Sequence, residues 1–219
     1  MDRTRPPRGG ARRGLTAAAA TLAGVCALTL VAAVNVQLSA ADTQRALRLA
    51  GAADGARAQF HAAYVFPIRD STIQEIQVLT EFRRTVLAAE EARRRGDWAV
   101  AQGARSLGGQ GVEETVKPWR GIVTLSATLQ LDALHTFVAV PNCELMLGGT
   151  PVVASAAQRT IPRSAVASPG RGATTTLLVG GSIESDFKAE AVAHESRLVV
   201  VLCDGREAAR QAIDFSRLE

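Results

Sequence analysis

The chain has 219 residues, enough for one ordinary domain and a membrane segment, and its formal net charge is +4. The first thirteen residues hold five arginines and one aspartate, which accounts for the whole +4, so the other 20 basic and 20 acidic residues cancel. A neutral body argues against an electrostatic nucleic-acid-binding protein, because such proteins gain most of their affinity by neutralising phosphates.

A long uncharged stretch follows the basic N-terminus, from Leu15 to Ala41. About 20 apolar residues in a helix cross a hydrocarbon core of about 30 Å, whereas the apolar part of a cleaved leader usually has about 7–15 residues. The length favours a transmembrane anchor over residues 14–37, with a basic cytoplasmic tail at 1–13 and the rest of the chain translocated. The alternative is an export signal cleaved after Ala41, since Ser39-Ala40-Ala41 supplies small residues.

The beginning of this stretch carries one resemblance to a known family. Arg13-Gly14-Leu15-Thr16, followed by an apolar helix, resembles the leader of a type IV pilin or pseudopilin. The resemblance implies cleavage after Gly14 and packing of the apolar helix into a filament core. The chain departs from the pattern at Ala19, where most members of that family carry glutamate.

Residues 38–119 are expected to be mainly helical, and residues 42–52 to continue the membrane helix outward. We expect the aromatic patch from Phe60 to Phe66 to pack against the folded domain. The clearest amphipathic helix is predicted over about 71–95, with Ser71 or Thr72 as its capping residue. Apolar residues recur there every three or four positions, arginines gather at the end, and Gly96 stops the helix.

From residue 120 the apolar residues alternate with polar ones, which indicates β-strands. Strands are expected at 120–131, 137–140, 143–147, 175–187 and 198–203, with an exposed loop at 162–173. Asp204-Gly205 predicts a hairpin, whose return arm at 207–215 reads as a strand rather than a helix. The sequence therefore predicts an α+β fold in which residues 120–219 form an antiparallel β-sandwich-like domain of six to seven strands.

Two of the three cysteines lie outside the apolar stretch. Cys26 falls within the predicted span, which leaves Cys143 and Cys203 in the translocated part. An oxidising compartment permits a disulfide between them, closing a loop of about 60 residues and adding a few kcal/mol. Two separate buried thiols are the alternative.

No catalytic, metal-binding or cofactor-binding motif stands out. The three histidines, His61, His135 and His194, are far apart and lack the spacing of paired metal ligands. An enzyme would need two or more of His135, His194, Asp186 and Glu144 to converge in one pocket. The carboxylates of Asp186, Glu184 and Glu190 could come together, but the sequence alone gives no pairing. We therefore expect neither catalysis nor a cofactor.

The combined expectation is a single-span bacterial envelope protein in the cytoplasmic membrane. Residues 14–37 would be its membrane contact, and its extracytoplasmic domain would bind or scaffold a protein partner in the envelope. The alternatives are a pilin-like filament subunit and a β-domain enzyme secreted after cleavage near Ala41.

Overall fold

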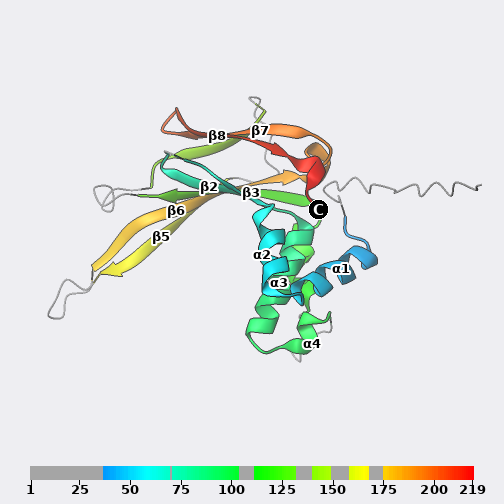
Figure 1. The fold of residues 1–219 in the computed structure, drawn as a ribbon. Helices are drawn as coiled ribbons and strands as arrows, with labels where there is room; N and C mark the ends of the chain where they lie inside the picture. The colour runs from blue at the N-terminus through cyan, green and yellow to red at the C-terminus, as the bar shows by residue number, and fades with distance from the viewer. Residues whose placement is uncertain (1–36, 70, 104–110, 132–139, 149–157, 168–174) are drawn as a thin grey trace, which may run out of the picture. The chain divides into compact units, whose positions relative to one another are not determined.

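The described residues of the chain fold as an α+β protein with eight strands in two antiparallel sheets (Figure 1). The computed structural model describes residues 37–69, 71–103, 111–131, 140–148, 158–167 and 175–219. The helices are α1 (Ala40–Ala50), α2 (Asp54–Ala62), α3 (Glu81–Arg94), α4 (Trp98–Ala101) and α5 (Val112–Val116), with short 3-10 turns η1 (Lys117–Trp119), η2 (Ala189–Ala191) and η3 (Phe215–Arg217). The strands are β1 (Val65–Pro67), β2 (Ile73–Leu79), β3 (Ile122–Gln130), β4 (Cys143–Leu147), β5 (Arg159–Ala167), β6 (Thr175–Lys188), β7 (Ser196–Cys203) and β8 (Arg206–Asp214).

Helix α1 has its own N-terminal cap. The Ser39 side chain accepts from the Asp42 backbone N–H, and the Asp42 carboxylate accepts from the Ser39 backbone N–H, so both satisfy otherwise unpaired donors. The expectation that residues 42–52 continue a helix from the span is therefore wrong, because residues 37–39 are not helical and α1 begins at Ala40.

No helix of the described residues is long and apolar enough to cross a membrane. The predicted span at 14–37 lies outside them, apart from residue 37.

The first half of the helix predicted over 71–95 is a strand, and this part of the prediction is wrong. Strand β2 runs antiparallel to β3, and its register shifts between Ile73 and Glu75. The extra residue of this bulge places Ile73 and Ile76 on the same buried face, three positions apart, which imitates helical spacing. Helix α3 begins only after Thr80, whose hydroxyl accepts from the Arg83 backbone N–H.

The exposed loop predicted at 162–173 is also partly wrong, since residues 159–167 form β5. The five-stranded sheet has the order β1-β2-β3-β6-β5, which leaves β5 at its edge. Pro162 has no backbone N–H and is tolerated in such a position, and both sides of the strand are exposed from Thr160 to Ala165. Its sequence therefore lacks the alternation of a half-buried strand. The remainder of the predicted loop, 168–173, lies outside the described residues.

The three-stranded sheet has the order β4-β7-β8 and follows the prediction closely. Strands β7 and β8 are joined by Asp204-Gly205, both with positive φ (50° and 76°), as a primed hairpin turn requires. The strand assigned to the return arm is confirmed. The strand expected at 137–140 lies, except for residue 140, outside the described residues.

Among the described residues, the buried apolar side chains form two clusters. One lies between the sheets and takes residues from both, among them Ile76, Leu125, Ile183, Val199 and Ile213. The other holds the helices together and includes Leu47, Phe82, Val86, Val100 and Val116. Phe60 packs against both clusters, and its ring centroid lies 5.0 Å from that of Tyr64 and 5.8 Å from that of Phe82. The predicted packing of the aromatic patch is confirmed at Phe60 and Tyr64.

Candidate functional site

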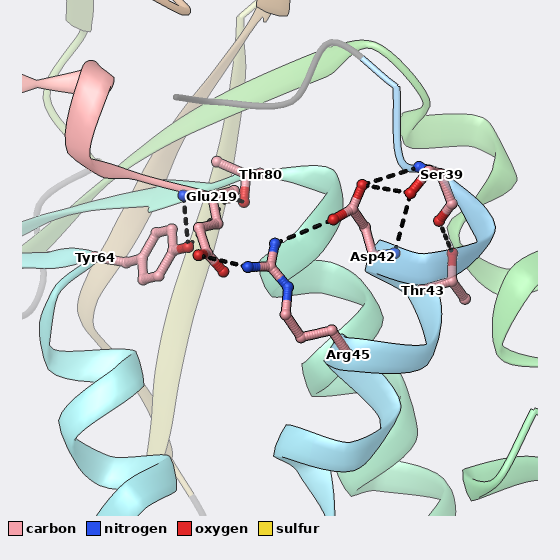
Figure 2. A network of polar contacts seen from close by, with 7 residues as sticks. All are labelled: Ser39, Asp42, Thr43, Arg45, Tyr64, Thr80 and Glu219. Atoms are coloured by element: carbon pink, nitrogen blue, oxygen red, sulfur yellow. Dashed lines mark hydrogen bonds and ion pairs between the residues drawn. The ribbon is translucent and has the colours of Figure 1, made fainter. Parts of the chain in front are cut away.

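A polar network joins α1, the strands and Glu219 (Figure 2). The Tyr64 hydroxyl donates to the Glu219 backbone oxygen at 3.1 Å and accepts from the Glu219 N–H at 3.0 Å. The Thr80 hydroxyl also donates to the Glu219 backbone oxygen. Glu219 is therefore held at the point where β1, β2 and α3 meet.

Arg45 connects this point to α1. Its guanidinium donates to Asp42 at 3.1 Å and to the Glu219 carboxylate at 2.9 Å, as Figure 2 shows. It also lies over the Phe82 ring, 4.9 Å from the centroid. The hydrogen bond from Ser39, with the backbone of Ser39 and the charge of Arg45, holds the pKa of the Asp42 carboxyl below its usual value. This carboxylate is thus charged where it caps α1 and pairs with Arg45.

Tyr64 and Arg83 form the buried side of this network. Burial raises the pKa of Tyr64 to about 12, and the Tyr64 side chain is only 2% exposed. The Arg83 guanidinium donates to the Val78 backbone oxygen at 2.7 Å and lies over the Tyr64 ring at 5.3 Å. Arg83 thereby ties the start of α3 to the end of β2.

A cavity of about 290 Å³ opens beside the network, between α1, α3 and α5. Glu81, the first residue of α3, lines it and is only 7% exposed. Its carboxylate accepts from the Gly121 backbone N–H at 3.3 Å, and the Arg120 Nε lies 4.0 Å away. Burial outweighs these partners and a further hydrogen bond from the Leu38 backbone, and it raises the pKa of Glu81 above its usual value.

A second polar cluster lies on the face of the five-stranded sheet that points away from the core. Thr124 donates to Asp186 at 2.6 Å and accepts from Arg84 at 2.7 Å. Arg159 binds Asp186 at 2.8 Å and Glu184 at 3.2 Å. Burial lowers the pKa of Arg84 to about 10, although the nearby Asp186 and Glu184 oppose this shift. The Arg84 guanidinium lies 3.8 Å from the centroid of the Trp119 ring. The two arginines and two carboxylates balance in charge.

The same face continues as rows of polar side chains across the strands. Directly opposite residues in neighbouring strands share a face. The register therefore brings together Gln77, Ser126 and Glu184 in one row. Glu75, Thr128 and Ser182 form the next row.

The residues named as candidates for catalysis do not gather in one place among the described parts of the chain. Of the carboxylates named together, Asp186 and Glu184 both bind Arg159, whereas Glu190 is exposed in η2. Glu144 alternates with core-facing Cys143 and Leu145 and so points outward from the other sheet. His194 lies exposed in the turn before β7, and His135 lies outside the described residues.

Metal-binding geometry does not occur in the parts of the chain that the structure covers: no group of three or more His, Cys, Asp or Glu side chains could hold an ion. His61, the remaining histidine, has its Nε2 3.1 Å from Glu90.

Cys143 and Cys203 are joined by a disulfide, with their sulfur atoms 2.01 Å apart. They are directly opposite each other in the β4–β7 pair, and Cys143 is fully buried. The bond connects β4, an edge strand of the three-stranded sheet, to β7, its central strand. It ends next to the Asp204-Gly205 turn, where the Asp204 carboxylate accepts from the Asn142 N–H at 3.2 Å.

The sequence alone does not identify the residues of the network around Glu219, or Glu81 in the cavity beside it. The network residues are Arg45, Tyr64 and Glu219. Arg45 and Glu219 are 174 residues apart, and nothing in their local sequence pairs them. Ser39-x-x-Asp42 could have been read as a cap, because serine followed three residues later by an acidic residue is a start signal for helices. With Ser39 as a cap, a separate helix is predicted to begin at Ala40, and the predicted membrane helix ends before that residue.

Comparison with known proteins gives no relative: no family model, no curated protein and no solved structure matches this chain.

Proposed function

We propose that this protein is a single-span component of a bacterial envelope, anchored through residues 14–37, with residues 1–13 in the cytoplasm. Its β-sandwich-like extracytoplasmic domain binds or scaffolds a protein partner and uses no cofactor. The proposal combines the sequence of the N-terminus with the way the described domain begins.

The observation that carries the proposal is the attachment of α1. Its cap, Ser39, follows the predicted span with only Leu38 between them. Arg45 then binds Glu219, and Leu47 packs in the helical cluster, so the first helix is part of the folded domain. In the sequence, the folded domain therefore begins directly after the predicted span.

The polar rows of the five-stranded sheet are the surface we assign to the partner. Ser126, Thr128 and Ser182 are half-buried and flanked by Gln77, Glu75 and Glu184. Short hydroxyl side chains line these rows, and the carboxylates of Glu75 and Glu184 keep acceptor capacity beyond the bonds they accept from Gln77 and Arg159. A partner with exposed donors fits this surface.

The positions of the candidate catalytic residues support a non-catalytic role. Asp186 is bound by Thr124 and Arg159, and Glu144 points out of the opposite sheet. These groups hold the fold together or face solvent on different sides.

The first experiment determines the mature N-terminus and the membrane partitioning of the native protein, by intact mass after cell fractionation. An uncut chain in the membrane fraction, together with a C-terminal reporter active only outside the cytoplasm, supports the proposal. Cleavage after Ala41 would replace it with a soluble secreted domain. Cleavage after Gly14 would favour a pilin-like subunit instead.

The partner surface is tested separately with a photo-crosslinking amino acid at Ser126 in living cells. Arg210, exposed on β8 of the other sheet, is the matched control position. We expect a discrete crosslinked product from position 126 that is absent at 210. Equal products at both positions would contradict this assignment without affecting the membrane anchor.

A further inference from the structure

The cavity between α1, α3 and α5 has a mixed apolar and polar lining that includes one buried carboxylate, Glu81. Leu38, Leu47, Val112 and Val116 supply most of its apolar lining. Glu81 is the most deeply buried of its charged residues, since Glu113 and Arg120 are exposed. With about 290 Å³, the cavity is at the lower end of the size range of small-molecule sites.

The cation nearest to Glu81 is committed elsewhere. Arg120 donates to Glu113 at 2.6 Å, and only its Nε comes within 4.0 Å of the Glu81 carboxylate. Its side chain is 48% exposed, so solvent screens what remains of the attraction. Counting Glu81, Glu113 and Arg120, the charged lining has a net charge of −1.

A buried carboxylate with too little compensating charge favours a positively charged guest. The raised pKa of Glu81 agrees with this, because it shows that the charged form is not fully stabilised by its present neighbours. A metal ion fits poorly, since it needs several ligands and no group of three or more His, Cys, Asp or Glu side chains in the described residues could hold one. An ammonium group on a short hydrocarbon body matches both features.

We propose that this cavity binds a small organic cation, a primary ammonium on a short apolar body, with Glu81 as its counter-ion. The ammonium replaces the distant Arg120 as the partner of the carboxylate, and the hydrocarbon body contacts Leu47 and Val116. This goes beyond the proposed envelope function and does not depend on where the protein resides.

The test uses the full chain in detergent micelles and three probes of equal length: n-butylamine, 1-butanol and butyrate. Binding is measured by saturation-transfer NMR and by the rise in thermal midpoint with probe concentration. We expect saturable binding of butylammonium, with a Kd on the order of millimolar because the probe is so small. Butanol and butyrate should bind at least tenfold more weakly. Equal binding of amine and alcohol would overturn the proposal.

Two substitutions test whether the Glu81 carboxylate is the group that binds the ammonium. Glu81→Gln should weaken amine binding at least tenfold, whereas Glu114→Gln should leave it unchanged. Glu114 is the matched control because it lies on the neighbouring helix but is exposed and pairs with Lys117 at 3.3 Å. Undiminished amine binding by folded Glu81→Gln protein would place the amine elsewhere.

A third variant keeps the test decisive should Glu81→Gln fail to fold. Arg120→Ala removes the competing cation at the exposed rim, so amine binding should tighten several-fold. Unchanged or weaker binding in this variant would show that Glu81 is not the counter-ion. All these outcomes leave the membrane anchor untouched, since none of the readouts depends on location.

Discussion

Arg45 on the first helix and Glu219 at the other end of the described chain form an ion pair of 2.9 Å. They are 174 residues apart, and the same guanidinium holds Asp42 beside the cap of α1. Arg45 is 45% exposed and Glu219 32%, so we expect a modest energy, up to about 1 kcal/mol, as for other exposed ion pairs. The ion pair matters mainly because of where it lies. It attaches α1, the helix that follows the predicted span in the sequence, to the strands through Glu219.

Arg45→Gln should therefore loosen α1 more than it destabilises the whole domain. We expect faster amide hydrogen exchange over residues 40–50 and a fall of at most about 1 kcal/mol in the free energy of unfolding. Arg48→Gln, on the same helix and exposed, is the control. Equal exchange in both variants would mean that apolar packing alone holds α1 in place.

The β-rich second half could be predicted because its signals are local. Alternation in β3 and the Asp204-Gly205 turn are each determined by a few neighbouring residues. β2 and β5 were misread because their patterns depend on the sheet around them. A bulge in β2 gave apolar residues helical spacing, and β5, exposed on the edge, needs no apolar alternation.

The candidate site could not be predicted for a related reason. Tyr64, Thr80 and Glu219 meet only after both sheets and α3 are in place, and no motif links them. The burial of Glu81 likewise follows from the packing of three helices around it. The order of residues along the chain does not predict which distant side chains come into contact in this way. Cys143 and Cys203, in contrast, are directly opposite each other in a single strand pair, β4 and β7.

Tyr64 gives a prediction that a single spectroscopic signal can check. It is the chain's one tyrosine, so phenolate absorbance near 295 nm reports its ionisation alone. We expect a folded-state pKa of about 12, against an ordinary value of 10.0, because the hydroxyl is buried and its backbone hydrogen bond with Glu219 only partly opposes that effect. Titration in denaturing urea should return the midpoint to about 10.

The same shift makes stability depend on alkaline pH. A pKa that is higher in the folded state means that the folded protein holds its proton where the unfolded chain has lost it. The stabilisation is therefore complete below pH 10 and is lost as the pH rises toward 12, by roughly 3 kcal/mol in all. Tyr64→Phe should be less stable at pH 8 by about 1–2 kcal/mol, since Glu219 loses its partner. It should also lose this part of the alkaline dependence; an unchanged pH profile would contradict the assignment.

The disulfide predicts both a thiol count and a stability change. The full-length chain has three cysteines, so unfolding without reductant should expose one thiol, that of Cys26, and reduction should expose three. Cys143→Ala/Cys203→Ala should lower the free energy of unfolding by about 4 kcal/mol, as expected for a closed loop of 60 residues. Three thiols in protein isolated from the native host under non-reducing conditions would contradict the bond.

Gly205, in the turn between β7 and β8, can be compared with Gly55 in α2. The two glycines have equally open surroundings but different backbone conformations. A Cβ added at Gly205 or at Gly55 would meet no atom within 4 Å, so neither substitution by alanine creates a clash. Gly205 has φ +76°, which an L-residue adopts at a cost of about 1–2 kcal/mol, whereas Gly55 lies in α2. Gly205→Ala should lower the free energy of unfolding by about that amount, and Gly55→Ala should raise it by up to about 1 kcal/mol. Chemical denaturation of the two variants decides this, and a Gly205→Ala protein as stable as the parent would show that the hairpin does not need the left-handed conformation.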